Sequence, residues 1–491
     1  MASRSPTLRA SSDPFGPDAE KHAAPLDGPA TGGHAHPDVE TSKEKRRSSL
    51  GSAWRRQSAN QELDPFGDDG EEGDVKYRTL KWWQCSMIMI AETISLGILS
   101  LPSVLATVGM VPGGIMIIGL GVVATYSGYV IGQFKAAHPW VHNMADAGYV
   151  LFKPLGPRAA IFGREFLGAA QTIFLVFSMA SHILTWTICL NTLTNGAACT
   201  VVWGIVGLLL FWVFDIPRTL LKVSWLSCAS FLSITTAVIV TMAGVGARDP
   251  SQGHFRATQQ ASFATAFLSV TNIVFAYAGH VAFFSFISEM KNPEDFPKAL
   301  VLLQVTDTGM YFVVAMVVYA YGGDEVDSPA LGTAGTLVGK VAWGLAIPTI
   351  IIAGVIYGHV ASKYIYVRIF RGTKHMSKKT LLSVGSWLAI TLTLWVVAWI
   401  IAESIPNFND LLALISSLFA SWFTYGISGI FWLFLNRGQY TRGWRKICLT
   451  VVNVLMFTLG AAICGMGLYA SGKAIHDEGG GSSWTCKSNA Q

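Results

Sequence analysis

The stretch MIMIAETISLGILSLPSVL, residues 87–105, is almost entirely apolar, yet an acidic residue, Glu92, lies near its centre. The Ser-Leu-Gly sequence at 95–97 and then Pro102 weaken any helix that forms around this acid. A carboxylate and an interrupted helix are both costly in the hydrocarbon core of a bilayer, and they persist there only where they serve a purpose. The stretch therefore predicts a membrane span with a functional site at its middle.

Similar apolar runs recur along the rest of the chain. Only 13% of the 491 residues are charged, whereas a soluble domain carries about 25%. Runs of roughly 18–25 apolar residues are each long enough to cross ~30 Å of hydrocarbon. The alternating pattern of a membrane barrel is missing from the sequence, which favours an all-α membrane protein. We expect eleven transmembrane helices, at about 82–105, 111–134, 165–190, 201–215, 223–244, 263–288, 299–321, 339–368, 381–402, 410–435 and 444–470.

Composition and charge also predict the domains and the orientation. Residues 1–76 are polar and rich in Pro, Gly and Ser, which predicts a disordered tail, and residues 77–470 form the predicted transmembrane transporter domain. Lysine and arginine gather in the segments on one side of the predicted bundle, and this side is expected to face the cytoplasm. The N-terminal tail is then cytoplasmic, and with an odd number of spans residues 471–491 form a short extracellular tail.

The tail carries short motifs with more than one interpretation. The sequence DPFG occurs at 13–16 and again at 64–67. It is explained by two polar turns, or by a linear motif similar to ligands of endocytic adaptors. Ser48, Ser49 and Ser58 follow pairs of basic residues, a pattern typical of kinase targets. Adaptors and kinases are therefore candidate partners of the tail.

The remaining composition excludes several classes of site. Cys199 and Cys486 both fall on the predicted outer side, where an oxidised pair is one option, and the other cysteines lie in or beside spans. No catalytic motif, clustered metal-ligating set or basic nucleic-acid-binding face occurs in the sequence. We expect no enzyme activity, cofactor, metal ion or nucleic-acid partner.

The sixth span shares the unusual feature of the first. It reads NIVFAYAGHVAFFSFISEM, residues 272–290, and its centre is Ala278-Gly279-His280. Two breaks five spans apart place the second copy upside down relative to the first. This is the arrangement of a five-plus-five inverted repeat with discontinuous helices 1 and 6 that meet at the midplane.

A helix break supplies binding groups as well as a weak point. The N-terminus of a half-helix offers free N–H groups to a carboxylate, and the C-terminus of the opposite half offers carbonyls to an ammonium. Two facing breaks suit a zwitterion such as an α-amino acid, although glycine also serves close helix packing. The titratable residues Glu92, His280 and His359 are candidates for proton coupling, whereas Asp307 and His182 are explained as well by structural hydrogen bonds.

Three segments resemble a known family. ETISLGILSLP (92–102), FAYAGHVAFFSFISEMKNPEDFPKAL (275–300) and KYIYVRIFR (363–371) are similar to the amino acid/auxin permease family, and nearest to fungal neutral amino acid permeases. The resemblance runs from about Lys76 to Tyr469. It implies eleven helices, a five-plus-five inverted repeat and secondary active import of amino acids.

The resemblance also implies roles for individual residues. The first-span segment would bind the substrate carboxylate, and the sixth-span segment would bind the amino group and frame the side chain. Glu289 would serve as a gate or as a helix-end ion pair with Lys291 or Lys298. The first-span break lacks the asparagine typical of sodium-coupled branches, which favours protons. The implied substrate-binding residues are Thr93, Ile94, Ser95, Leu96, Gly97, Ile98, Phe275, Ala276, Tyr277, Ala278 and Gly279.

These observations predict a proton-coupled importer of neutral amino acids, including aromatic and large aliphatic ones, in the plasma membrane. The binding site has a predicted apolar lining of Phe275, Tyr277, Phe283 and Phe284. We expect no further lysine or arginine within the membrane that could pair with the acidic side chain of a substrate. A channel would need an uninterrupted polar stripe, which the sequence lacks. A vacuolar exporter and a nutrient-sensing receptor on the same fold stay open as alternatives.

Overall fold

The computed structural model describes residues 78–252, 254–373, 375–376, 378–477 and 483–490. The predicted tail with Ser48, Ser49, Ser58 and both DPFG sequences lies outside the described residues. The described part folds into helices without a β-strand. The longer helices are α2 (Trp82–Val108), α3 (Met110–Ala137), α4 (Met144–Phe152), α5 (Pro157–Thr194), α6 (Thr200–Phe214), α7 (Leu220–Arg248), α8 (Phe263–Ala276), α10 (Phe296–Gly322), α11 (Thr336–Phe370), α12 (Leu381–Ser404), α13 (Phe408–Ile415), α14 (Ile427–Leu435) and α15 (Trp444–Asp477).

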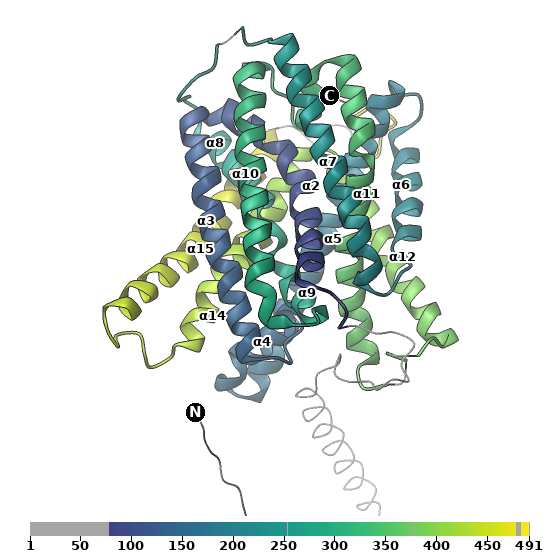
Figure 1. Ribbon diagram of the computed structural model, residues 1–491. Coiled ribbons are helices and arrows are strands. Elements are labelled where there is room, and N and C mark those ends of the chain that lie inside the picture. The colour runs from purple at the N-terminus through teal and green to yellow at the C-terminus, as the bar shows by residue number, and fades with distance from the viewer. Residues whose placement is uncertain (1–77, 253, 374, 377, 478–482, 491) are drawn as a thin grey trace, which may run out of the picture. The chain divides into compact units, whose positions relative to one another are not determined.

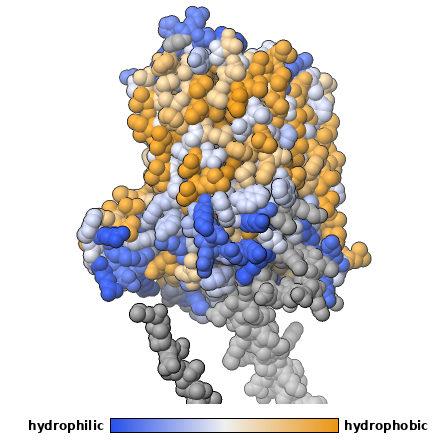
Figure 2. Space-filling view, in the orientation of Figure 1, coloured by the Kyte–Doolittle hydropathy of each residue, from blue (hydrophilic) through white to orange (hydrophobic). Residues whose placement is uncertain are grey.

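The helices confirm an all-α membrane protein. Within the described residues, nine helical segments are long and apolar enough to cross a membrane, and the bent sixth span makes a tenth. The short helix α6, with 15 residues, occupies the fourth predicted run. Figure 2 shows a broad apolar surface on the visible flank of the bundle, with hydrophilic residues gathered at the end that carries α4 and α9 in Figure 1. We call this the inner end, following the predicted orientation.

Helix α2 lies at the centre of the bundle. It packs against α7, α8, α10 and α11, and Figure 1 shows it beside α10. In its most apolar window 94% of the residues are buried, compared with 22% for α15 at the periphery. The acid-containing stretch is therefore surrounded by protein, and the polar groups of this helix meet other helices instead of lipid.

The sixth span is interrupted as predicted. Helix α8 ends at Ala276, a 3₁₀ turn follows over Ala278–Ala282, and α9 (Phe283–Glu289) continues the span after a bend of 40°. Every residue of the turn is buried. The break therefore lies inside the protein, where neighbouring groups can satisfy the freed backbone.

The expected break in the first span needs correction, because α2 is one continuous helix with Pro102 inside it. Hydroxyl groups support its carbonyls at the weak point: Ser100 donates to Gly97 at 2.9 Å, and Tyr311 donates to Thr93 at 2.8 Å. Proline removes the hydrogen bond from its own position to the carbonyl of residue 98 and crowds that carbonyl, which can bend a helix without ending it. The helix therefore keeps its path although its sequence predicts a weak turn.

Another helical irregularity, in the tenth span, was not predicted from the sequence. The tenth span contains eleven residues of π-helix, Ser416–Gly426, between α13 and α14. This π-helical segment contacts the 3₁₀ turn of the sixth span. π-Helices are rare, and they occur frequently at functional sites.

The outer end is tied together by the last described residues. Cys199, just before α6, forms a disulfide with Cys486. Asn489 beside it accepts a hydrogen bond from Asn191 of α5 at 2.7 Å, and the backbone carbonyl of Lys487 accepts one from Thr200 at 2.6 Å. The segment after α15 is thereby attached to α5 and α6.

The disulfide offers a test of the orientation. Intact cells that display the protein at their surface should incorporate a membrane-impermeant maleimide at Cys199 and Cys486 only after mild reduction, because both thiols then face the medium. The substitutions Cys199→Ser and Cys486→Ser, made together, provide the control for background labelling. Labelling that requires permeabilised cells would contradict an external C-terminus.

Candidate functional site

The first and sixth spans meet at their glycines. A Cβ atom at Gly97 would lie 2.5 Å from the Cα of Ala276, closer than such atoms ever approach. A Cβ atom at Gly279 would lie 2.7 Å from Cγ2 of Thr93 and 3.5 Å from Oε2 of Glu92. The two predicted segments are therefore in direct contact, and small residues make this contact possible.

Glu92 is buried at this contact, with 2% of its surface exposed. Among the described residues, neither carboxyl oxygen of Glu92 has a hydrogen-bond partner. The carboxyl group of Asp307 on α10 is close enough to interact with it electrostatically. Asp307 is also fully buried and accepts a hydrogen bond from the Thr93 hydroxyl at 2.6 Å. Two interacting carboxyl groups in a low-dielectric site cannot both be charged without a large cost, so at least one of them is expected to carry a proton.

Tyr311 links the two spans above this carboxyl pair. Its hydroxyl group lies 2.8 Å from the carbonyl oxygen of Thr93 and 2.7 Å from that of Ala276. The single hydroxyl proton can serve only one carbonyl at a time, so spare acceptor capacity remains at the C-terminal end of α8. Such an end suits an ammonium group. Sequence analysis missed Tyr311, although its spacing of four residues from Asp307 places both on one face of α10.

The other predicted residues have different surroundings. Tyr277 donates to the carbonyl of Ile117 on α3 at 3.0 Å, and its ring packs against that of Tyr311. Phe283 packs against His280 and Phe296, and Phe284 packs against other aromatic rings near α3 and α14. The remaining first-span and sixth-span residues, Ile94, Ser95, Leu96, Ile98, Phe275 and Ala278, are buried at or beside the contact.

The two histidines predicted for proton coupling, His280 and His359, form their contacts with groups other than Glu92 and Asp307. The ring nitrogens of His280 lie 2.8 Å from the carbonyl of Ala124 and 3.1 Å from that of Tyr277, so one nitrogen donates and the other faces an acceptor. His359 is buried on α11, and its Nδ1 atom lies 3.8 Å from Oδ1 of Asp215. Sequence analysis placed Asp215 at the end of a span and missed it, because its partner is more than a hundred residues away.

Glu289 forms an ion pair at the inner end, but with a different partner than predicted. It pairs with Lys363 of α11. Lys298 instead contacts Asp295 at 2.7 Å. The reason is direction: Glu289 is fully buried and points into the bundle, whereas Lys298 is exposed at the start of α10. Lys363 is also a buried basic residue, contrary to the expectation that the spans contain none.

A second cluster reinforces the inner end. The ammonium group of Lys135 on α3 donates to the carbonyls of Pro139 and Val141 and to Ser288 at 2.6–2.9 Å. Asp146 of α4 lies 3.8 Å from Arg371, just after α11. Burial raises the pKa of Asp146, and the positive charge of Arg371 opposes this shift. These contacts join α3, α4, α9 and α11, which closes the inner end.

The buried ion pair leads to a prediction. Lys363→Met should lower uptake strongly, because it leaves Glu289 buried without its partner, at a cost of about 3–5 kcal/mol. The double variant Glu289→Gln/Lys363→Met should recover part of the surface abundance. Lys298→Met is the matched control, since an exposed pair contributes only about 0–1 kcal/mol. Equal uptake in the Lys363→Met and Lys298→Met variants would contradict a role at the inner end.

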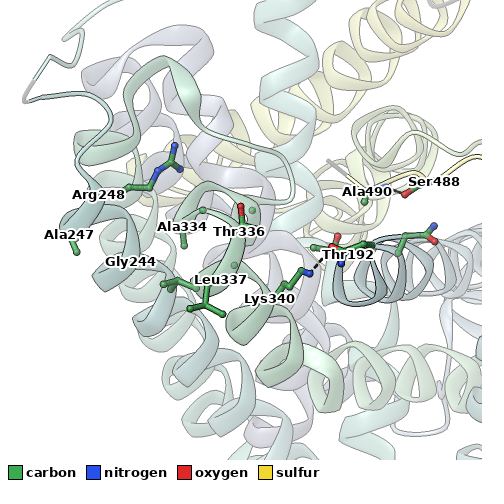
Figure 3. A pocket seen from close by; sticks show the side chains of 16 residues that line it. Thr192, Gly244, Ala247, Arg248, Ala334, Thr336, Leu337, Lys340, Ser488 and Ala490 are labelled. Carbon is green, nitrogen blue, oxygen red and sulfur yellow. Dashed lines mark hydrogen bonds between the residues drawn. The ribbon is translucent and has the colours of Figure 1, made fainter. Parts of the chain in front are cut away.

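Figure 3 shows a separate pocket of about 780 Å³ at the outer end, between the ends of α5, α7 and α11. Arg248 and Lys340 line it, and Lys340 donates to Asn195 at 2.6 Å. Its lining contains none of the predicted substrate-binding residues. This pocket is therefore distinct from the contact between α2 and α8.

Comparison with known proteins gives consistent matches. The family described as transmembrane amino acid transporter protein matches residues 78–472. The N amino acid transport system protein of Neurospora crassa is 37% identical over 419 residues, which cover 83% of this chain and 88% of the relative. A transmembrane transporter of Gibberella moniliformis is 30% identical over 427 residues, covering 83% and 89%.

A solved structure shows the same fold. The substrate-bound, outward-open state of a Na⁺-coupled sialic acid symporter superposes with a TM-score of 0.50 at 10% sequence identity. The match covers 81% of this chain and 91% of the symporter. The likeness confirms the five-plus-five inverted-repeat fold and carries no information on substrate or coupling ion.

Proposed function

Because this chain belongs to the transmembrane amino acid transporter family, we propose that it imports neutral amino acids by proton symport across the plasma membrane. The observation that carries this proposal is the buried carboxyl pair of Glu92 and Asp307 beside the break of the sixth span. Within the described part of the chain, no lysine, arginine or histidine side chain forms an ion pair with Glu92 or Asp307. A proton is the simplest counter-charge for such a pair.

The break supplies the substrate contacts. The ammonium group of the substrate replaces the Tyr311 hydroxyl at the carbonyls of Thr93 and Ala276. Its carboxylate binds N–H groups of the first span once α2 opens near Gly97, where Pro102 already removes one helical hydrogen bond. Binding and opening are therefore linked, because the substrate occupies groups that the closed protein uses internally.

The surroundings favour a neutral side chain. Phe275, Tyr277, Tyr311 and Tyr357 are buried near the contact, and the charged candidates there are both acids. The side chain of an acidic substrate would add a fourth carboxyl group to Glu92, Asp307 and the substrate's own α-carboxylate, and its desolvation would oppose binding. Large aliphatic and aromatic side chains gain from burial among aromatic rings.

The carboxyl pair explains how protons drive uptake. An acidic exterior loads a proton onto the pair, and the neutral form costs less to bury when the site closes. Opening to the less acidic cytoplasm hydrates the pair, which then loses the proton as the amino acid leaves. The proton gradient therefore biases the cycle toward import.

Uptake in cells that lack their own amino acid permeases tests the proposal. Labelled leucine or phenylalanine should accumulate more at acidic than at neutral external pH, without a requirement for sodium. Excess tryptophan should compete and excess glutamate should not. Sodium-dependent uptake, or equal competition by glutamate, would overturn the proposed coupling or substrate class. Binding without flux would indicate a nutrient sensor, and activity confined to vacuolar vesicles would indicate an exporter.

A further inference from the structure

A second buried acid and base lie closer to the inner end. Asp215 follows α6 directly and His359 belongs to α11; both side chains are almost fully buried, with exposures of 0% and 1%. Their facing atoms, Oδ1 of Asp215 and Nδ1 of His359, are 3.8 Å apart. Oδ1 of Asp215 has no hydrogen-bond partner among the residues that the structure describes.

The protein holds this carboxyl group in a fixed position. Its other oxygen, Oδ2, accepts a hydrogen bond from the indole of Trp395 at 3.1 Å, and the Asp215 carbonyl accepts one from Trp387 at 3.3 Å. A Cβ atom at Gly358 would lie 2.7 Å from Oδ2, so the α11 backbone passes directly against the carboxyl group. The edge of Trp387 packs on the ring of His359. The two tryptophans and Gly358 therefore hold the Asp215 carboxyl group next to His359.

The other charged groups nearby are already engaged. Arg218 donates to Ser383 at 2.7 Å and lies over the ring of Tyr366 at 4.6 Å. Lys363, one turn beyond His359 on α11, pairs with Glu289. His375, which follows α11, places its Nδ1 atom 2.7 Å from the hydroxyl oxygen of Thr380. The acid at Asp215 therefore has His359 as its own basic partner.

The position of the pair is as informative as its composition. Tyr357, two residues before His359, places its hydroxyl 3.4 Å from the carbonyl of Glu92. Lys363, four residues after His359, belongs to the inner-end ion pair. His359 therefore lies along α11 between the level of the carboxyl site and the inner-end ion pair, and Asp215 faces it from the end of α6.

We propose that Asp215 and His359 form a second proton-carrying site, through which the proton released at the central carboxyl pair leaves toward the cytoplasm. This inference rests on the proposed proton symport. When the inner half opens, Glu92 loses its proton to water, and a ring nitrogen of His359 takes up a proton. The resulting imidazolium lies beside the Asp215 carboxylate, which compensates its charge. Release of that proton to the cytoplasm returns the histidine to its neutral form, so one proton enters and one leaves.

The experiment must separate proton transfer from a structural ion pair. Asp215→Asn and His359→Gln are made singly and together, with His182→Gln as the control. His182 is another buried histidine, whose Nδ1 lies 2.9 Å from the carbonyl of Ile350, and no acidic partner is recorded for it in the described residues. Each variant, purified in proteoliposomes, is assayed for amino acid exchange and for accumulation driven by a pH gradient.

We expect the double variant to retain exchange and to lose accumulation, whereas the His182→Gln variant keeps both. If the pair were purely structural, the double variant should keep pH-driven accumulation, because it leaves no buried charge without a partner. Accumulation by the double variant at the level of the unmodified protein would overturn the inference. The unmodified protein distinguishes the two proposals: if it shows no pH-driven accumulation, the proposed symport itself fails.

A milder variant keeps the test decisive if the neutralised proteins do not fold. Trp395→Phe preserves both titratable groups and removes one hydrogen bond to the Asp215 carboxylate. With one hydrogen-bond donor fewer, the Asp215–His359 pair binds its proton more tightly. Acid inside the vesicles should therefore begin to inhibit uptake at an internal pH about one unit higher. An unchanged inhibition profile in this variant would contradict the assignment.

Discussion

A Gly97→Ala variant is expected to reach the membrane and to lose at least about nine-tenths of its uptake, a loss that corresponds to about 1.4 kcal/mol. The added methyl group would lie 2.5 Å from the Cα of Ala276, whereas ordinary contact begins at 3.4 Å. Helices α2 and α8 would have to separate by about 1 Å, and overpacking of this kind typically costs about 1–3 kcal/mol. The strain falls on the carbonyls of Thr93 and Ala276, which are the proposed ammonium site.

Two other glycines provide the comparison. Gly279→Ala should be less severe, because its Cβ meets a side-chain methyl group, Cγ2 of Thr93, before any backbone atom. Gly119→Ala on α3 should be silent, since nothing lies within 4 Å of that position. Initial rates of leucine uptake, normalised to surface protein, give the order. Full activity of the Gly97→Ala variant would mean that the substrate does not bind between these spans.

Glu92→Gln is expected to abolish pH-driven accumulation while exchange of amino acids across the membrane continues. Glutamine keeps the size of the side chain and can form hydrogen bonds, but it cannot gain or lose a proton. It also removes the electrostatic interaction with Asp307, so closing the site no longer requires protonation. Uptake should then become independent of external pH, and a labelled substrate should equilibrate without being concentrated.

The neighbouring acid gives the control for this variant. Asp307→Asn should keep part of the pH dependence, because Glu92 remains ionisable and the Thr93 hydroxyl can still donate to the amide oxygen. A Glu92→Gln protein that still concentrates leucine with an unchanged pH profile would remove Glu92 from the coupling mechanism. Similar loss in both variants would indicate that the two carboxyl groups titrate as a unit.

The sequence predicted positions along the chain better than it predicted partners. Apolar run length placed the spans, and the small residues at 278–280 placed the break of the sixth span, because both signals are local. Pairing across helices depends on how each helix is rotated, which a single sequence does not record. Glu289 was therefore assigned a lysine nearby in the chain, whereas its partner is Lys363.

In the first span, by contrast, a local signal in the sequence predicted a feature that the structure does not have. Its glycine and proline predicted an interruption, yet α2 is continuous, and its neighbours pack closely around it. Asp215 was overlooked because an acid at the end of an apolar run is ordinary, and only burial beside His359 makes it unusual. Tertiary contacts decide both cases, and they act between residues far apart in the sequence.

The disulfide between Cys199 and Cys486 has a consequence for how the protein is made. Its cysteines are 287 residues apart, so at about 5–20 residues per second the second thiol is synthesised roughly a quarter of a minute to a minute after the first. In the predicted orientation, the bond can close only after the later spans have been inserted and the segment that carries Cys486 has been translocated into the lumen. Oxidation at this position therefore marks a completely assembled chain, and the fraction of reduced Cys199 in a pulse-labelled pool would report how far biosynthesis has progressed.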